Sequence, residues 1–302
     1  MNDLISRLEA SVAAGRARHA YLLAGVDIER ADGIARGIAS LLLLGNKDIA
    51  RLSELPDYIE LEGSISIAQF RDEIQPEIYR ETYESRCRAV VFRSADRLSQ
   101  MVQNAMLKVI EEPPTDTYFI LTGNEYGILP TICSRCTIVR CPAARPVEIA
   151  RELTAIGVSE ADAEAYAKMS GCITKRALRL ASDEGFRAMR RELYSAFIKA
   201  LQGAPDFAFT KAKRDRADWM EACELLLLFT HDMLACACGQ GVEFCPDYEA
   251  EIKKLSSHFT IGKISSIINK LTESCERASS NASGGAVFDR LFADTAMISL
   301  SK

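Results

Sequence analysis

The sequence predicts an α/β domain with a parallel sheet, followed by two all-helical segments. Within the first 141 residues, short apolar runs typical of buried strands are separated by helical stretches. This alternation favours a parallel sheet covered by helices on both faces. The strand pattern ends after Cys141, and from about residue 186 onward the chain has helical patterning throughout. A chain of 302 residues can form two or three domains of this kind.

Three strands and one helix are expected early in the chain. HAYLLAG at residues 19–25 is apolar and ends in glycine, and the stretch at 31–44 that follows it has helical character. Residues 88–96 and 117–124 supply the second and third apolar runs. Each run is long enough for a strand and too short for a typical helix.

A further helix is expected between the second and third strands. Ser99 is a suitable N-cap residue, and the helix stops at the Pro113-Pro114 pair. The apolar residues of this segment fall on one helical face, which should pack on the sheet. They are Val102, Met106, Val109 and Ile110.

The expected domain boundaries follow from these patterns. Pro142 and Pro146 mark a linker after the sheet domain. We therefore expect a sheet domain at 1–141, a small helical domain at 142–184 and a larger helical domain at 185–302.

Composition indicates a globular protein of ordinary type. The chain is 48% hydrophobic and 26% charged, and its net charge of −5 argues against a surface that binds nucleic acid everywhere. No signal peptide is visible at the start, and the longest apolar run, at 38–44, is too short to span a bilayer. Ten scattered cysteines in such a chain indicate reduced thiols, so we expect a cytoplasmic location without membrane attachment.

Three segments, taken in order, carry a family resemblance. HAYLLAG, then QNAMLKVIEEPPTDTYFILTGN, then LPTICSRC at 129–136 resemble successive landmarks of the clamp-loader subunits of bacterial DNA polymerase III. The resemblance implies an AAA+-type core, a helical lid and an all-α C-terminal collar used for assembly. It also implies partners: ATP-binding gamma/tau subunits and delta in a pentameric loader, which places a sliding clamp on primed DNA.

The chain departs from this family at the phosphate-binding loop. A working loop reads G-x-x-x-x-G-K-[ST], with backbone N–H groups around the phosphates, a lysine for their charge and a hydroxyl for Mg²⁺. Here Gly25 survives, but Arg30 replaces the second glycine, Ala31 the lysine and Asp32 the hydroxyl residue. The same segment also contains three carboxylates, which would repel the phosphates of a nucleotide: Asp27, Glu29 and Asp32. The chain contains no other such motif.

The second half of the expected ATP site is altered as well. At the end of the second strand, active relatives carry Asp-Glu, which hold Mg²⁺ and orient water. This chain has Arg93-Ser94 there, and Thr122, at a position where relatives sense the γ-phosphate, is interpreted as a relic. We expect no bound nucleotide, no other cofactor and no intrinsic ATPase activity.

The tripeptide Ser134-Arg135-Cys136 is intact. The resemblance implies that Arg135 lies at a subunit boundary and reaches the γ-phosphate held by a neighbouring ATPase, as an arginine finger in trans. A planar, permanently charged guanidinium suits this task. The alternative is a surface arginine that only pairs with a carboxylate.

Two smaller groups of residues have simpler interpretations. Cys133, Cys136 and Cys141 lack a fourth ligand nearby, so we expect no metal and regard them as buried small hydrophobes. Lys175 and Arg176 resemble a lid segment that holds a nucleotide sensor in active relatives, and we interpret them as lid-surface charges.

A short basic cluster is formed by Lys211, Lys213, Arg214 and Arg216. A solvated helix face explains it, because no aromatic residues are interleaved with the charges as they are in many single-strand binders.

Two other functions remain in view. An active gamma/tau-type ATPase would bind nucleotide as the isolated chain, which the altered loop disfavours. A nucleic-acid-binding protein with a metal site at Cys133 to Cys141 would contain zinc or bind DNA in a strongly salt-dependent way.

Overall fold

The computed structural model describes residues 2–25, 27–62, 65–83, 85–278 and 282–301. The chain divides into two compact units, Met1–Ala144 and Arg145–Lys302. The second unit contains both helical segments that the sequence separated at residue 184. The division into three domains therefore stays a prediction.

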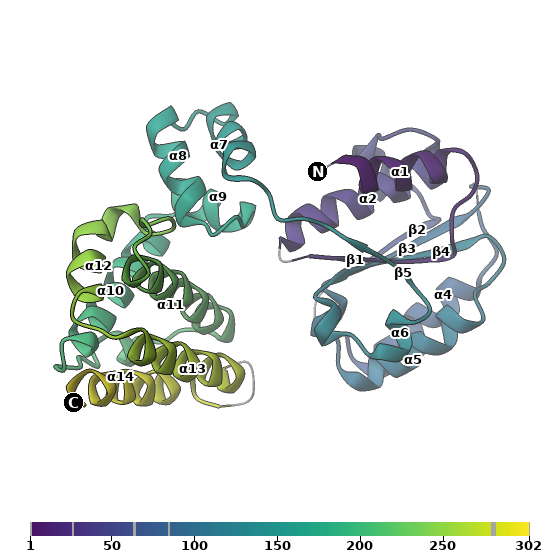
Figure 1. The fold of residues 1–302 in the computed structure, drawn as a ribbon. Helices are drawn as coiled ribbons and strands as arrows, with labels where there is room; N and C mark the ends of the chain where they lie inside the picture. Colours follow the sequence, from purple (N-terminus) through teal and green to yellow (C-terminus); the bar gives the residue numbers. More distant parts are fainter. Residues whose placement is uncertain (1, 26, 63–64, 84, 279–281, 302) are drawn as a thin grey trace. The chain divides into compact units, whose positions relative to one another are not determined.

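The first unit is α/β, as Figure 1 shows. Its strands are β1 (Ala20–Ala24), β2 (Tyr58–Glu62), β3 (Arg88–Arg93), β4 (Thr117–Gly123) and β5 (Thr137–Arg140). Its helices and helical turns are α1 (Asn2–Ala13), α2 (Ile28–Leu44), η1 (Ile49–Glu54), α3 (Ile67–Gln69), η2 (Phe70–Ile74), α4 (Gln75–Tyr79), η3 (Ala95–Arg97), α5 (Gln100–Glu111), η4 (Glu125–Gly127) and α6 (Pro130–Cys133).

The strands form one sheet in the order β2-β3-β4-β1-β5, and every neighbouring pair is parallel. The predicted parallel sheet is therefore confirmed, with β1, β3 and β4 close to the expected positions. The sequence analysis missed β2 and β5. β2 reads YIELE and is only half-buried, whereas β5 has four residues and is exposed at three of them, so neither is a continuous apolar run.

Two cores cover the two faces of the sheet. Helices α1 and α2 lie on one face, and α4, α5 and α6 on the other (Figure 1). Neighbouring residues of β4 point to opposite faces, so Ile120 packs with α2 and Phe119 with α5. The predicted helix after Ser99 is also confirmed. The Ser99 hydroxyl accepts a hydrogen bond from the N–H of Val102, and the four predicted apolar residues are at most 1% exposed.

The second unit is entirely helical apart from its loops and turns. Its elements are α7 (Pro146–Ala155), α8 (Glu160–Met169), α9 (Thr174–Ser182), α10 (Glu184–Leu201), η5 (Phe209–Lys211), α11 (Arg216–Ala237), η6 (Pro246–Tyr248), α12 (Glu249–Ser256), α13 (Ile261–Ala278) and α14 (Gly284–Leu300). The expected all-helical C-terminal part is confirmed.

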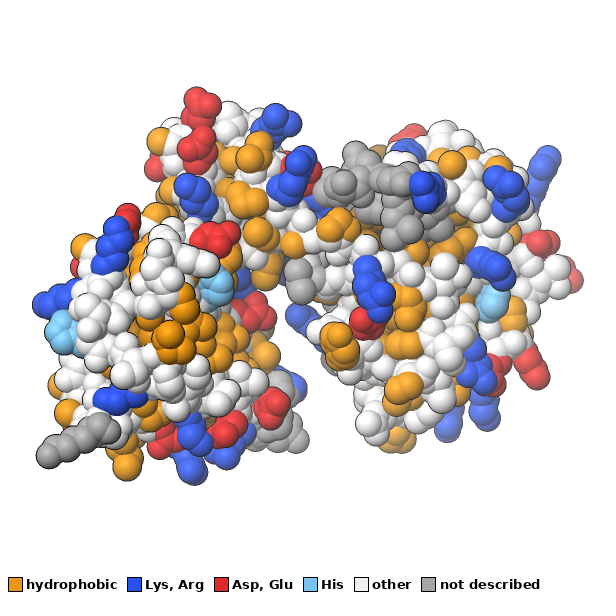
Figure 2. Space-filling view, viewed as in Figure 1, with side chains coloured by type: hydrophobic (Ala, Val, Ile, Leu, Met, Phe, Trp, Pro, Cys, Tyr) orange, Lys and Arg blue, Asp and Glu red, His pale blue; other side chains and the backbone are white. Residues whose placement is uncertain are grey.

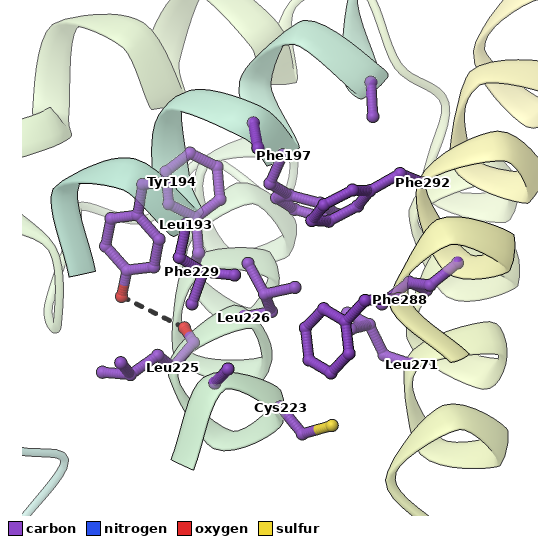
Figure 3. Close-up of a cluster of buried hydrophobic side chains, with 14 of the residues drawn as sticks. Leu193, Tyr194, Phe197, Cys223, Leu225, Leu226, Phe229, Leu271, Phe288 and Phe292 are labelled. Atoms are coloured by element: carbon purple, nitrogen blue, oxygen red, sulfur yellow. Dashed lines mark hydrogen bonds between the residues drawn. The ribbon is translucent and has the colours of Figure 1, made fainter. Parts of the chain in front are cut away.

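Aromatic side chains fill the core of this unit (Figure 3). Phe197 of α10 meets Phe229 of α11 edge-on, with ring centroids 5.8 Å apart, and Phe288 and Phe292 of α14 close the cluster. The buried hydroxyl of Tyr194 donates to the carbonyl of Leu225 at 3.1 Å. Helices α10, α11 and α14 therefore share one core.

The structure corrects the interpretation of Arg176. Lys175 is exposed as expected, but Arg176 is only 3% exposed. Its guanidinium contacts Glu221 at 2.5 Å, Glu224, and the carbonyl of Ser170 at 3.0 Å. Arg176 thus joins α9 to α11 instead of lying on the surface, because two carboxylates of α11 compensate its charge.

The interpretation of the basic cluster is also wrong. Lys211 ends η5, Lys213 and Arg214 lie in the loop that follows, and Arg216 begins α11. The cluster is therefore a loop and a helix start instead of one helix face. On the face of each unit drawn in Figure 2, basic and acidic side chains are interspersed. None of the helices in the described ranges is both long enough and apolar enough to cross a bilayer.

Candidate functional site

The carboxyl ends of β1, β3 and β4 meet at one edge of the sheet. In open α/β sheets this edge is where ligands bind. Gly25 follows β1 here, and its backbone is close to β5: a Cβ at this position would lie 2.9 Å from the carbonyl oxygen of Cys141. The surviving glycine thus allows a close approach between two segments.

Helix α2 starts at Ile28, three residues after this glycine. Val26 lies outside the described residues, and Asp27 caps the helix by accepting a hydrogen bond from the N–H of Arg30 at 3.4 Å. Ala31 and Asp32, which the sequence analysis aligned with the lysine and the hydroxyl residue of a phosphate-binding loop, are both buried, with Asp32 2% exposed. A buried carboxylate requires hydrogen-bonding partners.

Arg93 supplies the main partner of Asp32. Its Nε lies 2.7 Å from Oδ2 of Asp32, and its NH1 lies 2.5 Å from Oε2 of Glu62 on β2. Glu60 is 3.5 Å away and also pairs with Arg36 of α2 at 2.7 Å. Burial alone would lower the pKa of Arg93, but its hydrogen bond to Asp32 and the nearby carboxylates outweigh this effect and raise it.

Thr122 and Ser94 complete this network. The Thr122 hydroxyl donates to Oδ1 of Asp32 at 2.5 Å and accepts from the backbone N–H of Ser94 at 3.0 Å. Ser94 adopts a left-handed conformation with φ of 50°. Asp32, Arg93, Ser94 and Thr122, which the sequence placed in three separate motifs, are therefore brought together by the fold.

We call these residues the Asp32–Arg93–Thr122 network. Their polar and charged side chains are paired with one another. Asp32, Glu60 and Glu62 surround the guanidinium groups of Arg93 and Arg36, so carboxylates outnumber cations by one among these five residues. The sequence analysis missed both glutamates and Arg36, because it did not recognise β2. Such an arrangement stabilises the edge of the sheet and does not favour a polyanion.

Arg135 lies in the turn after α6, at the surface of the first unit. Its side chain is 39% exposed, and its NH2 lies 2.5 Å from Oε1 of Glu111 at the end of α5. Its NH1 donates to the carbonyl of Thr131 at 2.9 Å and to the Ser134 hydroxyl at 3.3 Å. The structure thus contains the carboxylate partner of the simpler interpretation and also keeps the guanidinium accessible.

Gln103, which the sequence analysis missed, fixes the start of α6. This residue is 3% exposed and accepts a hydrogen bond from the N–H of Leu129 at 2.8 Å. Its amide nitrogen donates to the carbonyls of Leu98 and Gly127, both at 3.1 Å. A buried polar side chain with all three contacts holds the turn that carries Arg135.

The fold separates the three cysteines that could have suggested a metal site. Cys133 and Cys136 pack with the core under α5, whereas Cys141 packs with the core under α2, on the other face of the sheet. Burial raises the pKa of Cys136 to about 12 and that of Cys141 to about 11. Across the described ranges, no group of three or more His, Cys, Asp or Glu side chains forms a metal-ligating cluster.

Comparison with known proteins identifies relatives of the first unit. Residues 1–144 match the family model described as DNA polymerase III, delta subunit. The delta-prime subunit of DNA polymerase III from Haemophilus influenzae is 35% identical over 28% of this chain and 27% of its own length. The delta-prime subunit of Bacillus subtilis is 24% identical over 76% of this chain and 71% of its own length.

Gamma subunits are similar to this chain as well. The gamma subunit of Buchnera aphidicola from Acyrthosiphon pisum is 28% identical over 54% of this chain and 49% of its own length. The chain thus spans about a quarter of the Haemophilus relative and about half of the Buchnera one.

Among solved structures, a gamma-subunit-related protein of DNA polymerase III from Thermotoga maritima has a TM-score of 0.48 at 16% identity. That comparison covers 98% of this chain and all of the other.

Proposed function

We propose that this chain acts as a delta-prime-like subunit of the DNA polymerase III clamp-loader family, that it binds no nucleotide itself and that it completes the ATP site of a neighbour. In this role Arg135 contacts the phosphates held by an adjacent gamma/tau subunit. The delta subunit, the sliding clamp and primed DNA are the other proposed partners. The chain then affects ATP hydrolysis only across a subunit boundary, in the cytoplasm.

One observation carries the nucleotide-free part of this proposal. The residues that replace the loop hydroxyl and the Mg²⁺-binding acid, Asp32 and Arg93, pair with each other at 2.7 Å. A bound triphosphate would have to break this pair and meet the carboxylates around it. It would find no lysine at position 31 to offset its own charge.

The geometry of Arg135 supports the second part. Ion pairs between exposed side chains contribute about 0–1 kcal/mol, so leaving Glu111 costs Arg135 little. A guanidinium can then meet two phosphate oxygens, a stronger charge-assisted interaction. Glu111 holds the arginine near its working position until a neighbour provides phosphate.

Similarity to gamma subunits favours a second candidate, an ATP-binding subunit. Such a protein would bind fluorescent ATP analogues as the isolated chain and release them on addition of unlabelled ATP. The Asp32–Arg93–Thr122 network speaks against it. Absence of binding by the isolated chain, with a gamma subunit as positive control, would reject this candidate.

The finger role is tested by reconstituting the loader with Arg135→Ala. We expect the complex to assemble, as seen by gel filtration, and its ATPase activity stimulated by clamp and primed DNA to fall by a factor of about 10³ or more at the site that Arg135 serves. Because other sites in the loader keep their own arginines, single-turnover hydrolysis and clamp loading are the sensitive measurements.

Arg140→Ala is a matched control. Arg140 is also an exposed arginine of the first unit paired with a carboxylate, Glu125, at 3.2 Å. Its removal should leave hydrolysis and loading unchanged. Normal ATPase activity and loading in the Arg135→Ala complex would refute the finger role.

A further inference from the structure

The second unit brings together two cysteines that the proposed function does not use. Cys223 lies on α11 and Cys275 on α13, and both are free thiols. Their side chains are joined by a hydrogen bond, although the whole of α12 separates them along the chain. Two thiols in contact can be linked by a disulfide and released again by reduction. The pair is therefore a candidate for reversible oxidation.

The packing of α11 against α13 explains why the two thiols meet. The two helices contact each other, and Trp219 near the start of α11 lines the same surface hollow as Ala278 at the end of α13. A contact between the start of one helix and the end of the other makes the pair antiparallel. Cys223 and Cys275 each lie about one helical turn inward from this end. The antiparallel packing thus places them opposite each other.

The two sulfur atoms differ in their access to solvent. Cys223 is fully buried in the core that α11 shares with Leu271 of α13 (Figure 3). Cys275 packs against the same core but is partly exposed. A water-soluble oxidant therefore reaches Cys275 first, whereas Cys223 reacts with a group that Cys275 already carries.

The hydrogen bond also makes Cys275 the more reactive thiol. The S–H of Cys223 donates to the sulfur of Cys275 and stabilises its thiolate, which lowers the pKa of Cys275, although burial and the charges of Glu224 and Glu276 oppose this effect. The same hydrogen bond, together with burial, raises the pKa of Cys223. The thiolate is the form of cysteine that attacks an oxidant. Cys275 is thus suited to react first and Cys223 to react second.

We propose that Cys223 and Cys275 are a site of reversible oxidation, at which a hydroperoxide oxidises Cys275 and Cys223 then closes a disulfide between α11 and α13. The bond would tie the two helices together within the second unit. Disulfides in reducing compartments are usually transient and sense oxidants, so reduction would return the pair to two thiols.

The chemistry takes place in two steps. The sulfur of Cys275 attacks one oxygen of the hydroperoxide, the O–O bond breaks, and Cys275 becomes a sulfenic acid while the second oxygen leaves as hydroxide or alkoxide and takes up a proton. The sulfur of Cys223 then attacks the sulfur of Cys275. The S–O bond breaks, and its oxygen leaves as water with the proton of Cys223. Two electrons pass from the two thiols to the hydroperoxide.

Mass spectrometry of the full chain tests this proposal. The reduced chain is treated with hydrogen peroxide after removal of the reductant, and the remaining thiols are alkylated in denaturant. Digestion after glutamate releases Cys223 in residues 222–224 and Cys275 in residues 274–276, each separate from the other cysteines. We expect these two peptides to be linked to each other, with the mass of two hydrogen atoms lost. Dithiothreitol should restore both thiols.

Variants assign the role of each cysteine. Cys223→Ala removes the second thiol without adding a polar group to the core, so Cys275 should stop at the sulfenic acid. Its labelling by dimedone should then rise several-fold over that of the unaltered chain. Cys275→Ser should leave Cys223 as a free thiol. Cys238→Ala, at an exposed thiol of the same unit, should form the link as the unaltered chain does. Circular dichroism checks that each variant is folded.

Three results would overturn the inference. The first is that Cys223 and Cys275 keep their thiols under peroxide treatment that oxidises the exposed Cys238. The second is a link from either residue to a third cysteine. The third is equal dimedone labelling of Cys275 in the Cys223→Ala variant and the unaltered chain. All are measured on the chain alone, so a failure here would leave the Arg135 experiment, which requires the assembled loader, unaffected.

Discussion

The guanidinium of Arg93 lies 2.7 Å from the carboxylate of Asp32, which joins the end of strand β3 to the first turns of helix α2. Without Arg93, the buried Asp32 would keep only the Thr122 hydroxyl as a partner, and without Asp32, Arg93 would keep only the two glutamates of β2. Together they compensate each other. The two positions at which the sequence departs from the phosphate-binding and Mg²⁺-binding patterns thus form a structural contact between β3 and α2.

Asp32→Ala should therefore destabilise the protein even though no ligand is involved. The change leaves Thr122 without its acceptor and Arg93 with only Glu62 and Glu60. Since Arg93 keeps these partners, we expect a loss of about 2 kcal/mol in the free energy of unfolding, less than the full cost of a broken buried pair. Urea denaturation followed by circular dichroism measures it.

Arg93→Ala and the double variant complete the test. If the two side chains stabilise each other, the double variant should lose less than the two single losses added together, by about 1 kcal/mol. Asp72→Ala, at an exposed aspartate of the same unit, should change stability by less than about 0.5 kcal/mol. If the loss in the double variant equalled the sum of the two single losses, the Asp32–Arg93 contact would contribute no stability of its own.

Arg176→Ala should loosen the contact between α9 and α11. The guanidinium contacts two carboxylates and a carbonyl, and the alanine variant leaves the partly buried Glu221 without a cation. Because Glu224 is 48% exposed and can be hydrated, we expect a loss of about 2–3 kcal/mol. Arg176→Lys should restore little, since one ammonium cannot reproduce the planar fork.

Hydrogen exchange gives the location of this effect. Amides of α9 and the adjoining part of α11 should exchange faster in Arg176→Ala, while the sheet of the first unit stays protected. Lys175→Ala changes the exposed neighbour and should behave like the unaltered chain. If Arg176→Ala were as stable as Lys175→Ala, Arg176 would behave as an ordinary surface charge.

The sequence predicted elements where the physical signal was local. The face of α5, its Ser99 cap and the apolar runs of β1, β3 and β4 are all continuous in sequence. The sequence analysis did not recognise β2, because its alternating YIELE segment is half polar. Its glutamates are the partners of Arg93 and Arg36, so missing one edge strand also hid half of the network at the candidate site.

Long-range pairing explains the remaining errors. Arg176 resembled a surface charge because the carboxylates that compensate it lie 45 and 48 residues further along the chain. The basic cluster is a local exception, because the aromatic residues near Arg214 directly flank the cluster: its guanidinium lies 3.9 Å from the ring of Phe209 and 5.5 Å from that of Trp219. Motif reading identified Asp32, Arg93 and Arg135 as unusual, but only the fold shows which of them touch.

Alkaline pH should destabilise the first unit through its buried thiols. Burial raises the pKa of Cys136 to about 12 and that of Cys141 to about 11, whereas a free thiol titrates near 9.0. The folded state therefore holds these protons more tightly than the unfolded state. This contribution to stability is complete below pH 9 and is lost as the pH rises toward the folded-state values, by at most about 1.4 kcal/mol per pH unit for each thiol.

Urea denaturation at a series of pH values from below 9 to about 11 measures this loss. Tyrosines also titrate in this range, so the informative quantity is the difference between variants. Cys141→Ala should lose less stability with rising pH than the unaltered chain, although packing lowers its stability at neutral pH. Cys238→Ala, at an exposed thiol, should keep the original dependence. If Cys141→Ala kept it too, the Cys141 thiol would already ionise as readily in the folded chain as in the unfolded one.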